Sequence, residues 1–307
     1  MGATTQDLSH EPLAGRPCLV CAAPVRLRVA AWTAQCPSCG TWRSDLEPEI
    51  ESASLHRAID TGARSEGLRE LRERNNRRIL DEIAALQPLE GKRLIDVGSA
   101  HGWFLEAAAT RGLDAAGIEP EDAIAEHARA AGHRVRSGYF PAVLEPGEQA
   151  DVITFNDVLE HIPDVDETLR ACAQTLRPGG VLSINIPSAT GLGYRVATLL
   201  GRLGVKGPYE RFWQYGLPSP HAHYFTPEAL ATLVRRHGLI LRRTVPLSSV
   251  QRRGLWARLH TIERPSVRSV IAFVGLWVAA PILDRPANSD IVLVLAQRAA
   301  EEPSRGV

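Results

Sequence analysis

Short apolar runs alternate with amphipathic helical patterns between residues 91 and 186. Runs rich in Val, Ile and Leu that alternate with helical patterns are typical of a parallel sheet covered by helices on both faces. The predicted strands are Arg93–Val97, Ala115–Glu119, His133–Ser137, Asp151–Phe155 and Val181–Ile186. The predicted helices are Trp103–Arg111, Glu121–Ala131 and Asp166–Leu176, and a turn at Arg177-Pro178-Gly179-Gly180 connects the last helix to the last strand.

Two further strands, Leu239–Val245 and Ile291–Gln297, are expected to pair as a hairpin and complete a seven-stranded sheet. Insertions at 188–224 and 246–288 interrupt this α/β pattern. The first insertion is rich in glycine and in aromatic residues, namely Tyr194, Tyr209, Phe212, Trp213 and Tyr215. These aromatics fit either a lid over an acceptor site or the core of a helical subdomain, and the sequence leaves both open.

Residues 46–90 form a connector with apolar positions at helical spacing, which predicts one or two amphipathic helices, separated at Gly62 and Gly67. Five arginines crowd this stretch: Arg69, Arg72, Arg74, Arg77 and Arg78. Acidic residues stand three or four positions away from several of them. We therefore favour a solvated, ion-paired helix face over an anion-binding site.

The second insertion carries Arg252, Arg253, Arg258, Arg264 and Arg268, followed by an uncharged stretch from Ser269 to Leu283. Fifteen such residues, interrupted by Gly275 and Pro281, are short for a bilayer span. We expect a buried or lid helix here. The alternative is a peripheral membrane contact through 252–283, which would suit a lipid-linked acceptor.

Four of the five cysteines form two C-x-x-C pairs near the amino terminus. Cys18 and Cys21 are separated by fourteen residues from Cys36 and Cys39. Four thiolates at this spacing close a tetrahedral zinc site, and nothing leaves a coordination position open. We therefore predict a structural zinc ribbon over residues 1–45 with a hairpin between the pairs, while Cys172 is expected to be a core residue.

The strand ending at Asp96 leads into the glycine loop Gly98-Ser99-Ala100-His101-Gly102. Such a loop at the carboxyl end of a strand faces a crevice, and glycine lets a ligand approach the backbone closely. About twenty residues further on, a second strand ends at Glu119, an acid placed to accept hydrogen bonds from ribose hydroxyls. The loop and the acid together predict a nucleotide-like cofactor.

The loop D-x-G-x-A-x-G resembles the first motif of the class I S-adenosylmethionine-dependent methyltransferases, in which glycine is common at Ala100. The stretch from Asp151 to Asp164, with its Val158-Leu159-Glu160-His161 core, is similar to a segment of family members that modify small molecules, including quinone rings. This resemblance extends over about two hundred residues and implies a Rossmann-like methyltransferase domain at 91–300 that binds S-adenosylmethionine.

The resemblance also implies site residues. The expected cofactor-binding residues are Asp96, Gly98, Ser99, Gly102, Glu119, Pro120, Tyr139, Asn156 and Asp157. An oxygen acceptor loses a proton during methylation, and histidine suits that task. His161, His221 and His223 are the candidates, the last two from the segment Pro220-His221-Ala222-His223-Tyr224-Phe225-Thr226 that precedes a helix capped by Thr226.

Lysine plus arginine and aspartate plus glutamate are equal at 35 each, so no global field draws the protein to nucleic acid. The polar amino terminus lacks the apolar core of a signal peptide, which favours a cytoplasmic location. We interpret the chain as an S-adenosylmethionine-dependent methyltransferase acting, by weak preference, on an oxygen of a small-molecule, sugar or lipid-linked acceptor. The alternatives are a zinc-ribbon RNA methyltransferase and a non-catalytic cofactor-binding protein.

Overall fold

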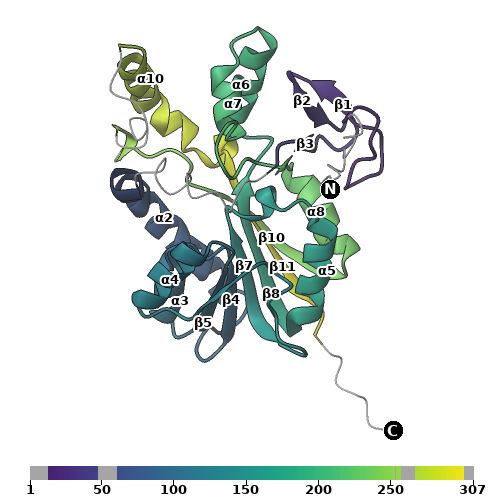
Figure 1. Cartoon of the computed structure of the whole chain (residues 1–307), viewed down its shortest axis with the longest axis vertical. Coiled ribbons are helices and arrows are strands. Elements are labelled where there is room, and N and C mark those ends of the chain that lie inside the picture. The colour runs from purple at the N-terminus through teal and green to yellow at the C-terminus, as the bar shows by residue number, and fades with distance from the viewer. Residues whose placement is uncertain (1–12, 48–60, 253, 257–266, 301–307) are drawn as a thin grey trace, which may run out of the picture.

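The computed structural model describes residues 13–47, 61–252, 254–256 and 267–300 (Figure 1). Seven strands form one sheet in the order β10-β11-β8-β7-β4-β5-β6. Their bounds are β4 (Arg93–Val97), β5 (Asp114–Glu119), β6 (Val135–Ser137), β7 (Ala150–Asn156), β8 (Leu176–Pro187), β10 (Leu239–Leu247) and β11 (Ile291–Arg298). Strands β4 to β8 are parallel and β11 runs antiparallel to both neighbours, which confirms the predicted α/β sheet and its final hairpin.

Alternate residues of the sheet face two separate cores. Leu94, Val152 and Leu293 pack beneath three helices on one face, and Ile95, Ile153 and Val294 pack beneath two helices on the other. The first group is α2 (Thr61–Ala84), α3 (Trp103–Ala109) and α4 (Asp122–Ala130), and the second is α5 (Val165–Thr175) and α8 (Pro227–Arg236). Both faces are therefore covered, as the continuous apolar runs predict.

Two local predictions were wrong. Helix α2 continues through Gly67, so the connector is one helix in the part described rather than two separated by glycine. The Arg177-Pro178-Gly179-Gly180 stretch lies within the irregular start of β8: Leu176 pairs with Ala150 and Val181 pairs with Val152, so the intervening four residues bulge out of the ladder. At Gly67 the continuing helix overrode the local glycine signal. Gly179 does turn the chain, with a φ angle of 78°, but it does so inside the irregular start of β8.

The amino-terminal cysteine module contains the predicted hairpin, β1 (Arg26–Arg28) and β2 (Ala30–Gln35), followed by β3 (Trp42–Ser44). A fourth strand, β9 (His223–Tyr224), comes from the other end of the chain and pairs with β3. The Ser44 hydroxyl also donates to the His221 carbonyl at 2.7 Å. The cysteine module thus shares its sheet with the segment that carries two predicted catalytic histidines.

The first insertion forms α6 (Leu192–Arg202) and α7 (Gly207–Phe212), and its aromatics make a third core with the cysteine module. Tyr194, Tyr209 and Trp213 are buried together with Trp42 and Tyr224, and the rings of Tyr194 and Tyr224 stack at 4.3 Å. Core packing is therefore the correct interpretation for these three aromatics. Tyr215 is half exposed and stacks on Trp32.

The second insertion contains α10 (Val267–Leu283), which rises beside α6 at one end of the molecule (Figure 1). We expected a buried or lid helix; burial was wrong, because one side of α10 exposes Val267, Ile271, Val274, Trp277, Val278 and Ile282, and the lid stays a prediction. Among the described residues, no helix combines the length and apolarity needed to cross a membrane. Four of the five arginines expected to flank it, at 253, 258, 264 and 268, lie outside the described side chains.

Candidate functional site

The glycine loop connects β4 to α3 in a conformation that its sequence permits. Gly98 and Gly102 have φ angles of 71° and 82°, and Ala100 also lies in the left-handed region at 45°. A Cβ at position 98 would stand 2.4 Å from the side chain of Val158, so only glycine fits there without a shift. The backbone N–H groups of Gly98 and Ser99 donate to the Ile118 carbonyl, which ties the loop to β5.

A cavity of about 150 Å³ opens where β4, β7 and β8 end. Five predicted cofactor residues line it: Asp96, Gly98, Ser99, Asn156 and Asp157. The other nine lining residues were not predicted to bind the cofactor, among them Arg72, Asn75 and Asn76 from α2 and Asn185 from β8. A signal for two of them exists in the sequence, because adjacent asparagines are poor helix formers in the middle of a long helix and indicate a role other than helix propensity.

The remaining predicted cofactor residues do not line this cavity. Gly102 packs against His133, and Tyr139 is 52% exposed. The carboxylate of Glu119 accepts the N–H of Ala100 at 2.9 Å and that of Glu121 at 3.2 Å, and it therefore holds the glycine loop in place. Pro120 likewise is not among the lining residues. Their assignment to the cofactor stays a prediction.

Burial dominates the electrostatics of the cavity. Asp96 is 2% exposed, and burial raises the pKa of its carboxyl to about 7, although it accepts hydrogen bonds from Thr154 and Asn156 at 2.6 and 3.0 Å. Burial also raises the pKa of Asp157. Four buried polar atoms have no hydrogen-bond partner among the residues described: Ser99 Oγ, His101 Nδ1, Asn156 Oδ1 and Asn185 Oδ1. Buried polar groups are nearly always paired, so these atoms fit a polar ligand.

The three predicted catalytic histidines lie in two places. His161 and His221 are neighbours, with ring centroids 4.7 Å apart, whereas the His223 ring faces the Pro163 carbonyl at 3.3 Å. Burial lowers the pKa of all three, that of His223 to about 4. Neutral imidazoles are therefore expected at pH 7, and the assignment of a catalytic base stays a prediction.

The four cysteines come together as their spacing predicts. The Sγ atoms of Cys18 and Cys39 are 3.5 Å apart, those of Cys21 and Cys36 are 3.4 Å apart, and all four atoms lie within 4.8 Å of one another. Four Zn–S bonds of about 2.3 Å in a tetrahedron place sulfurs roughly 3.8 Å apart, so the cluster is compatible with structural zinc. Cys172 is buried in the core, as expected.

The profile of a family described as a methyltransferase domain matches residues 68–243, which include the glycine loop, the cavity and all three histidines. The chain belongs to this methyltransferase family. Its fold places the glycine loop and the end of β7 at one edge of the sheet, as the resemblance to class I methyltransferases implies. The predicted Rossmann-like methyltransferase fold is thereby confirmed.

Curated relatives of this methyltransferase domain carry the name ubiquinone biosynthesis O-methyltransferase. The protein of Sinorhizobium medicae (strain WSM419) is 39% identical over 104 residues, 32% of this chain and 42% of that protein. The human mitochondrial protein is 25% identical over 226 residues, 67% of this chain and 55% of that protein. The chain spans about half the length of the curated relatives it matches.

Solved methyltransferases share the fold. A chain from the complex between the Haloferax volcanii Trm112 methyltransferase activator and a methyltransferase matches with a TM-score of 0.55 at 15% identity, over 81% of this chain and 99% of that chain. Haemonchus contortus phosphoethanolamine N-methyltransferase 2, solved with S-adenosylhomocysteine, matches with a TM-score of 0.51 at 18% identity, over 73% of this chain and 52% of that chain. At these identities the likeness establishes the fold alone.

Proposed function

We propose that this protein transfers a methyl group from S-adenosylmethionine to an oxygen of a small acceptor presented at an anionic membrane surface. The cofactor supplies an activated methyl on a sulfonium sulfur. The observation that carries the methyl-transfer proposal is the cavity at the carboxyl ends of β4, β7 and β8, with its unpartnered buried polar atoms. The family membership and the names of the curated relatives support it.

The lining residues divide the binding task between them. Gly98 and Ser99 offer backbone and hydroxyl groups close to a ligand, and Asp96 and Asn156 add a carboxylate and an amide at the floor. Binding a cationic ligand next to Asp96 would favour its ionised form, although burial disfavours it in the free protein. Asn75 and Asn76 close the cavity from the α2 side. Such a site would hold the methyl group in line with an acceptor oxygen, which the displacement at the sulfonium carbon requires.

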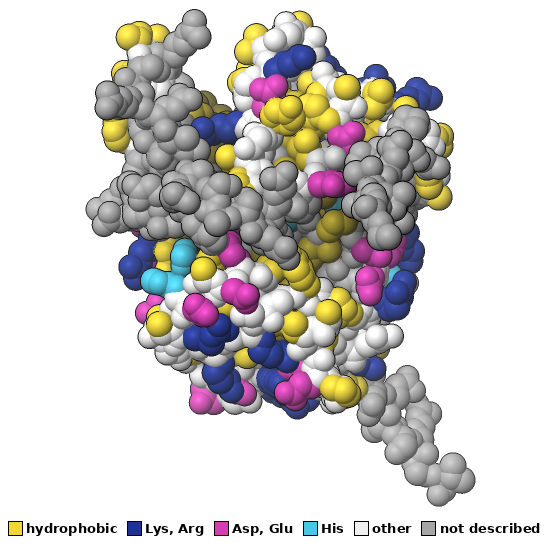
Figure 2. Space-filling view, viewed as in Figure 1, with side chains coloured by type: hydrophobic (Ala, Val, Ile, Leu, Met, Phe, Trp, Pro, Cys, Tyr) yellow, Lys and Arg dark blue, Asp and Glu magenta, His cyan; other side chains and the backbone are white. Residues whose placement is uncertain are grey.

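The membrane part of the proposal is supported by two protrusions, α6 with α7 and α10. Both insertions leave the sheet at the carboxyl edge of the parallel strands, because α6 follows the end of β8 and α10 precedes the start of β11, which pairs with that end. Helix α6 and the residues after it expose Val196, Leu199, Leu203 and Val205, and α10 exposes the apolar side described above. Figure 2 shows hydrophobic side chains at the upper ends of both protrusions. Two separate apolar ends at one edge fit insertion into a lipid interface.

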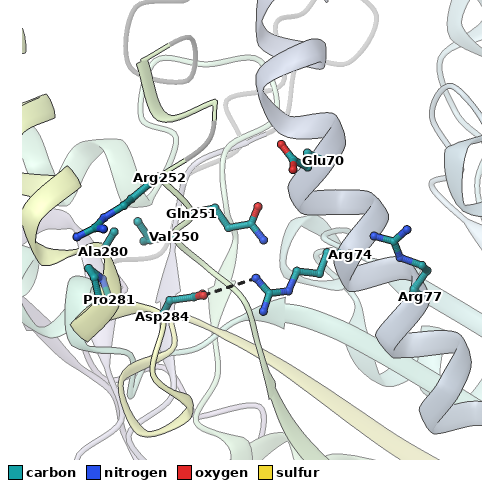
Figure 3. Close-up of a pocket in the computed structure, with 9 residues that line it drawn as sticks. All are labelled: Glu70, Arg74, Arg77, Val250, Gln251, Arg252, Ala280, Pro281 and Asp284. Carbon is teal, nitrogen blue, oxygen red and sulfur yellow. Dashed lines mark ion pairs between the residues drawn. The ribbon is translucent and has the colours of Figure 1, made fainter.

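Basic side chains outnumber acidic ones in a cavity at the base of α10. This cavity of about 420 Å³ is lined by Arg74, Arg77 and Arg252 and by the acidic Glu70 and Asp284 (Figure 3). Arg74 lies 3.9 Å from Asp284, and the Arg252 guanidinium lies 4.1 Å from the centre of the Trp277 ring. Arginines beside an exposed apolar helix suit a phosphate headgroup at the bilayer surface.

This arginine cavity and the cofactor cavity lie on opposite faces of α2. Positions 72, 75 and 76 line one and positions 70, 74 and 77 line the other, which at 100° per residue puts the two sets about half a turn apart. A phosphate in the arginine cavity would therefore anchor the protein to the membrane surface rather than enter the cofactor cavity.

Calorimetric titration with S-adenosylmethionine tests the cofactor assignment. The folded wild-type protein should bind it, and Asp96→Ala should weaken binding at least tenfold. Absence of binding by folded wild type would overturn the methyltransferase proposal. Retained binding without methylation of small, sugar or lipid-linked acceptors in the presence of vesicles would favour a non-catalytic role instead.

Co-sedimentation with vesicles tests the membrane surface. Wild-type protein should sediment with vesicles of phosphatidylglycerol mixed with phosphatidylcholine. A much smaller fraction of it should sediment with vesicles of phosphatidylcholine alone. The double variant Ile271→Glu/Val274→Glu should abolish sedimentation, since both positions are exposed and lie on α10. The matched control Ile240→Glu changes an exposed residue near the start of β10, at the opposite edge of the sheet, and should sediment like wild type. Equal sedimentation of all three proteins would contradict the membrane assignment.

A further inference from the structure

Glu160, His161 and His221 bring three metal-binding side chains to one point beside the cofactor cavity. One ligand atom from each lies within 4.8 Å of the other two. Glu160 and His161 belong to η1 (Leu159–His161), which follows directly after the cavity residues Asp157 and Val158. His221 comes from the segment before β9, and the Glu160 carbonyl accepts the N–H of Ala222, which fixes the two segments together. Local spacing along the chain does not pair His221 with this carboxylate, because Glu160 lies 61 positions earlier.

Polar atoms in this cluster have no partner in the described structure. Glu160 is 1% exposed, and its Oε2 atom has no hydrogen-bond partner among the residues described. The same holds for Nδ1 of His221, whose residue is 6% exposed. Glu160 Oε1 lies 4.0 Å from Nε2 of His161, too far for a hydrogen bond. Burying the ionised carboxyl with its Oε2 atom unpartnered is costly, and a cation beside Oε2 would reduce that cost.

Each imidazole has one ring nitrogen beside a polar group, as is usual for histidines that bind a metal ion through the other nitrogen. Nδ1 of His161 lies 2.9 Å from the Pro220 carbonyl, which only accepts hydrogen bonds, so Nδ1 carries the proton and the Nε2 lone pair faces Glu160. Nε2 of His221 lies 2.9 Å from the side-chain amide of Gln214. The Gln214 atom at this contact is the amide nitrogen; exchanging the amide nitrogen and oxygen, which have nearly the same shape, puts the proton on Nε2 of His221 and leaves the unpartnered Nδ1 with a lone pair for a metal ion.

We propose that Glu160, His161 and His221 bind a divalent first-row metal ion such as Mn²⁺ or Zn²⁺. Two imidazoles and one carboxylate are a ligand set that such ions accept, and three protein ligands leave coordination positions for an oxygen of another molecule. This site is separate from the four-cysteine cluster. The oxygen and nitrogen ligands also differ from the soft thiolates there, so the two sites select different ions.

The role of this ion rests on the proposed methyl transfer. An acceptor hydroxyl bound to the metal has a lowered pKa and releases its proton to solvent, as metal-bound water does. The resulting oxygen then forms the new O–C bond while the S–C bond of the cofactor breaks, which leaves S-adenosylhomocysteine. The imidazoles act as neutral ligands in this scheme, in place of a general base.

Calorimetric titration of the zinc-loaded full chain with MnCl2 tests the metal site, because Mn²⁺ competes poorly for four thiolates. Wild type should bind one equivalent and should quench the free aqueous Mn²⁺ signal in electron paramagnetic resonance. Glu160→Gln and His221→Gln should weaken binding at least tenfold, and Gln214→Leu roughly 10- to 100-fold as expected for a second-shell partner. His223→Gln is the matched control, since it changes a buried histidine on β9 outside the cluster, and it should bind Mn²⁺ like wild type.

Thermal unfolding and cofactor titration distinguish a failure of the metal-site proposal from a failure of the proposed function. Mn²⁺ should raise the unfolding temperature of wild type and leave that of Glu160→Gln unchanged, which needs no activity. S-adenosylmethionine titration of the same variant checks that it is folded. Absence of Mn²⁺ binding by wild type, or equal affinity in Glu160→Gln, would overturn the metal site. Mn²⁺ binding by a protein that does not bind S-adenosylmethionine would keep the metal site and overturn the proposed function.

Discussion

The glycine-loop region, residues 93–158, takes most of its cavity from one continuous run of strands and loops, with α2 and the end of β8 closing it. The histidine region combines the cysteine module at 13–47, the short segment at 160–161 and residues 207–226. In the first region the strands that meet belong to one alternating series of strands and helices. In the second, a strand near residue 43 pairs with one near residue 223. The two regions should therefore respond differently when a single contact is removed.

The largest expected effect comes from removing a zinc ligand in the histidine region. Zinc contributes roughly 10–16 kcal/mol to the folding of small zinc peptides, so Cys36→Ser should unfold the cysteine module and release β9. Zinc content should fall to zero by atomic absorption. Tryptophan emission should shift to longer wavelength, because Trp42 and Trp213 are buried in the shared aromatic core.

The matched control for this change is Cys172→Ala, which alters a buried cysteine outside the cluster and should keep its zinc. The affinity for S-adenosylmethionine should change by only a few-fold in Cys36→Ser, because the glycine loop draws none of its contacts from the cysteine module. Loss of cofactor binding with the tryptophan emission unchanged would contradict the distinction between the two regions.

A smaller effect on stability, this time in the glycine-loop region, is expected from Asp96→Asn. The folded-state pKa of Asp96 is raised to about 7 from an ordinary value of 3.8, so the stability that its protonated form contributes is complete below about pH 4 and is lost as pH rises through 7. This difference corresponds to about 4 kcal/mol at most. Asparagine can keep both hydrogen bonds to its oxygen and avoids the buried charge.

Denaturant unfolding of Asp96→Asn at pH 5 and pH 8 checks this expectation. The variant should be more stable than wild type at pH 8, should approach it at pH 5, and should bind S-adenosylmethionine more weakly. Zinc content and the tryptophan emission of the histidine region should stay unchanged. A variant less stable than wild type at pH 8 would show that ionised Asp96 is stabilised by partners that the free protein provides.

The smallest effect is expected at the junction, where Thr226 caps α8. Its hydroxyl accepts the Ala229 N–H at 3.1 Å and donates to the Cys39 carbonyl at 3.3 Å, so it connects the helix to the cysteine module. Thr226→Ala should lower the free energy of unfolding by about 1 kcal/mol. Thr232→Ala, at an exposed position of the same helix, is the control and should change it by less than about 0.5 kcal/mol. If the two substitutions lower the free energy of unfolding equally, the helix cap does not explain the effect of Thr226→Ala.

Most of the fold could be predicted from the sequence, because the strands and the helices that cover them follow from the local spacing of apolar residues. The strands around Asp96 and Asn156, the C-x-x-C pairs and the cap at Thr226 all depend on residues within a few positions of one another. The glycine loop belongs to the same class, since its conformation follows from Gly98 and Gly102. Local chemistry thus determined the glycine-loop side of the cavity and the four-cysteine cluster.

Only the tertiary structure decided which residues of distant segments come into contact. The adjacent Asn75 and Asn76 are unusual within a helix, but nothing near them in the sequence says which cavity they line. Glu160 is joined to His221 only because η1 and the segment before β9 lie side by side. The apolar stretch of α10 is equally compatible with burial and exposure, because hydrophobicity records what a side chain prefers and not whether another element covers it. Such contacts depend on how distant segments are packed, which no local pattern specifies.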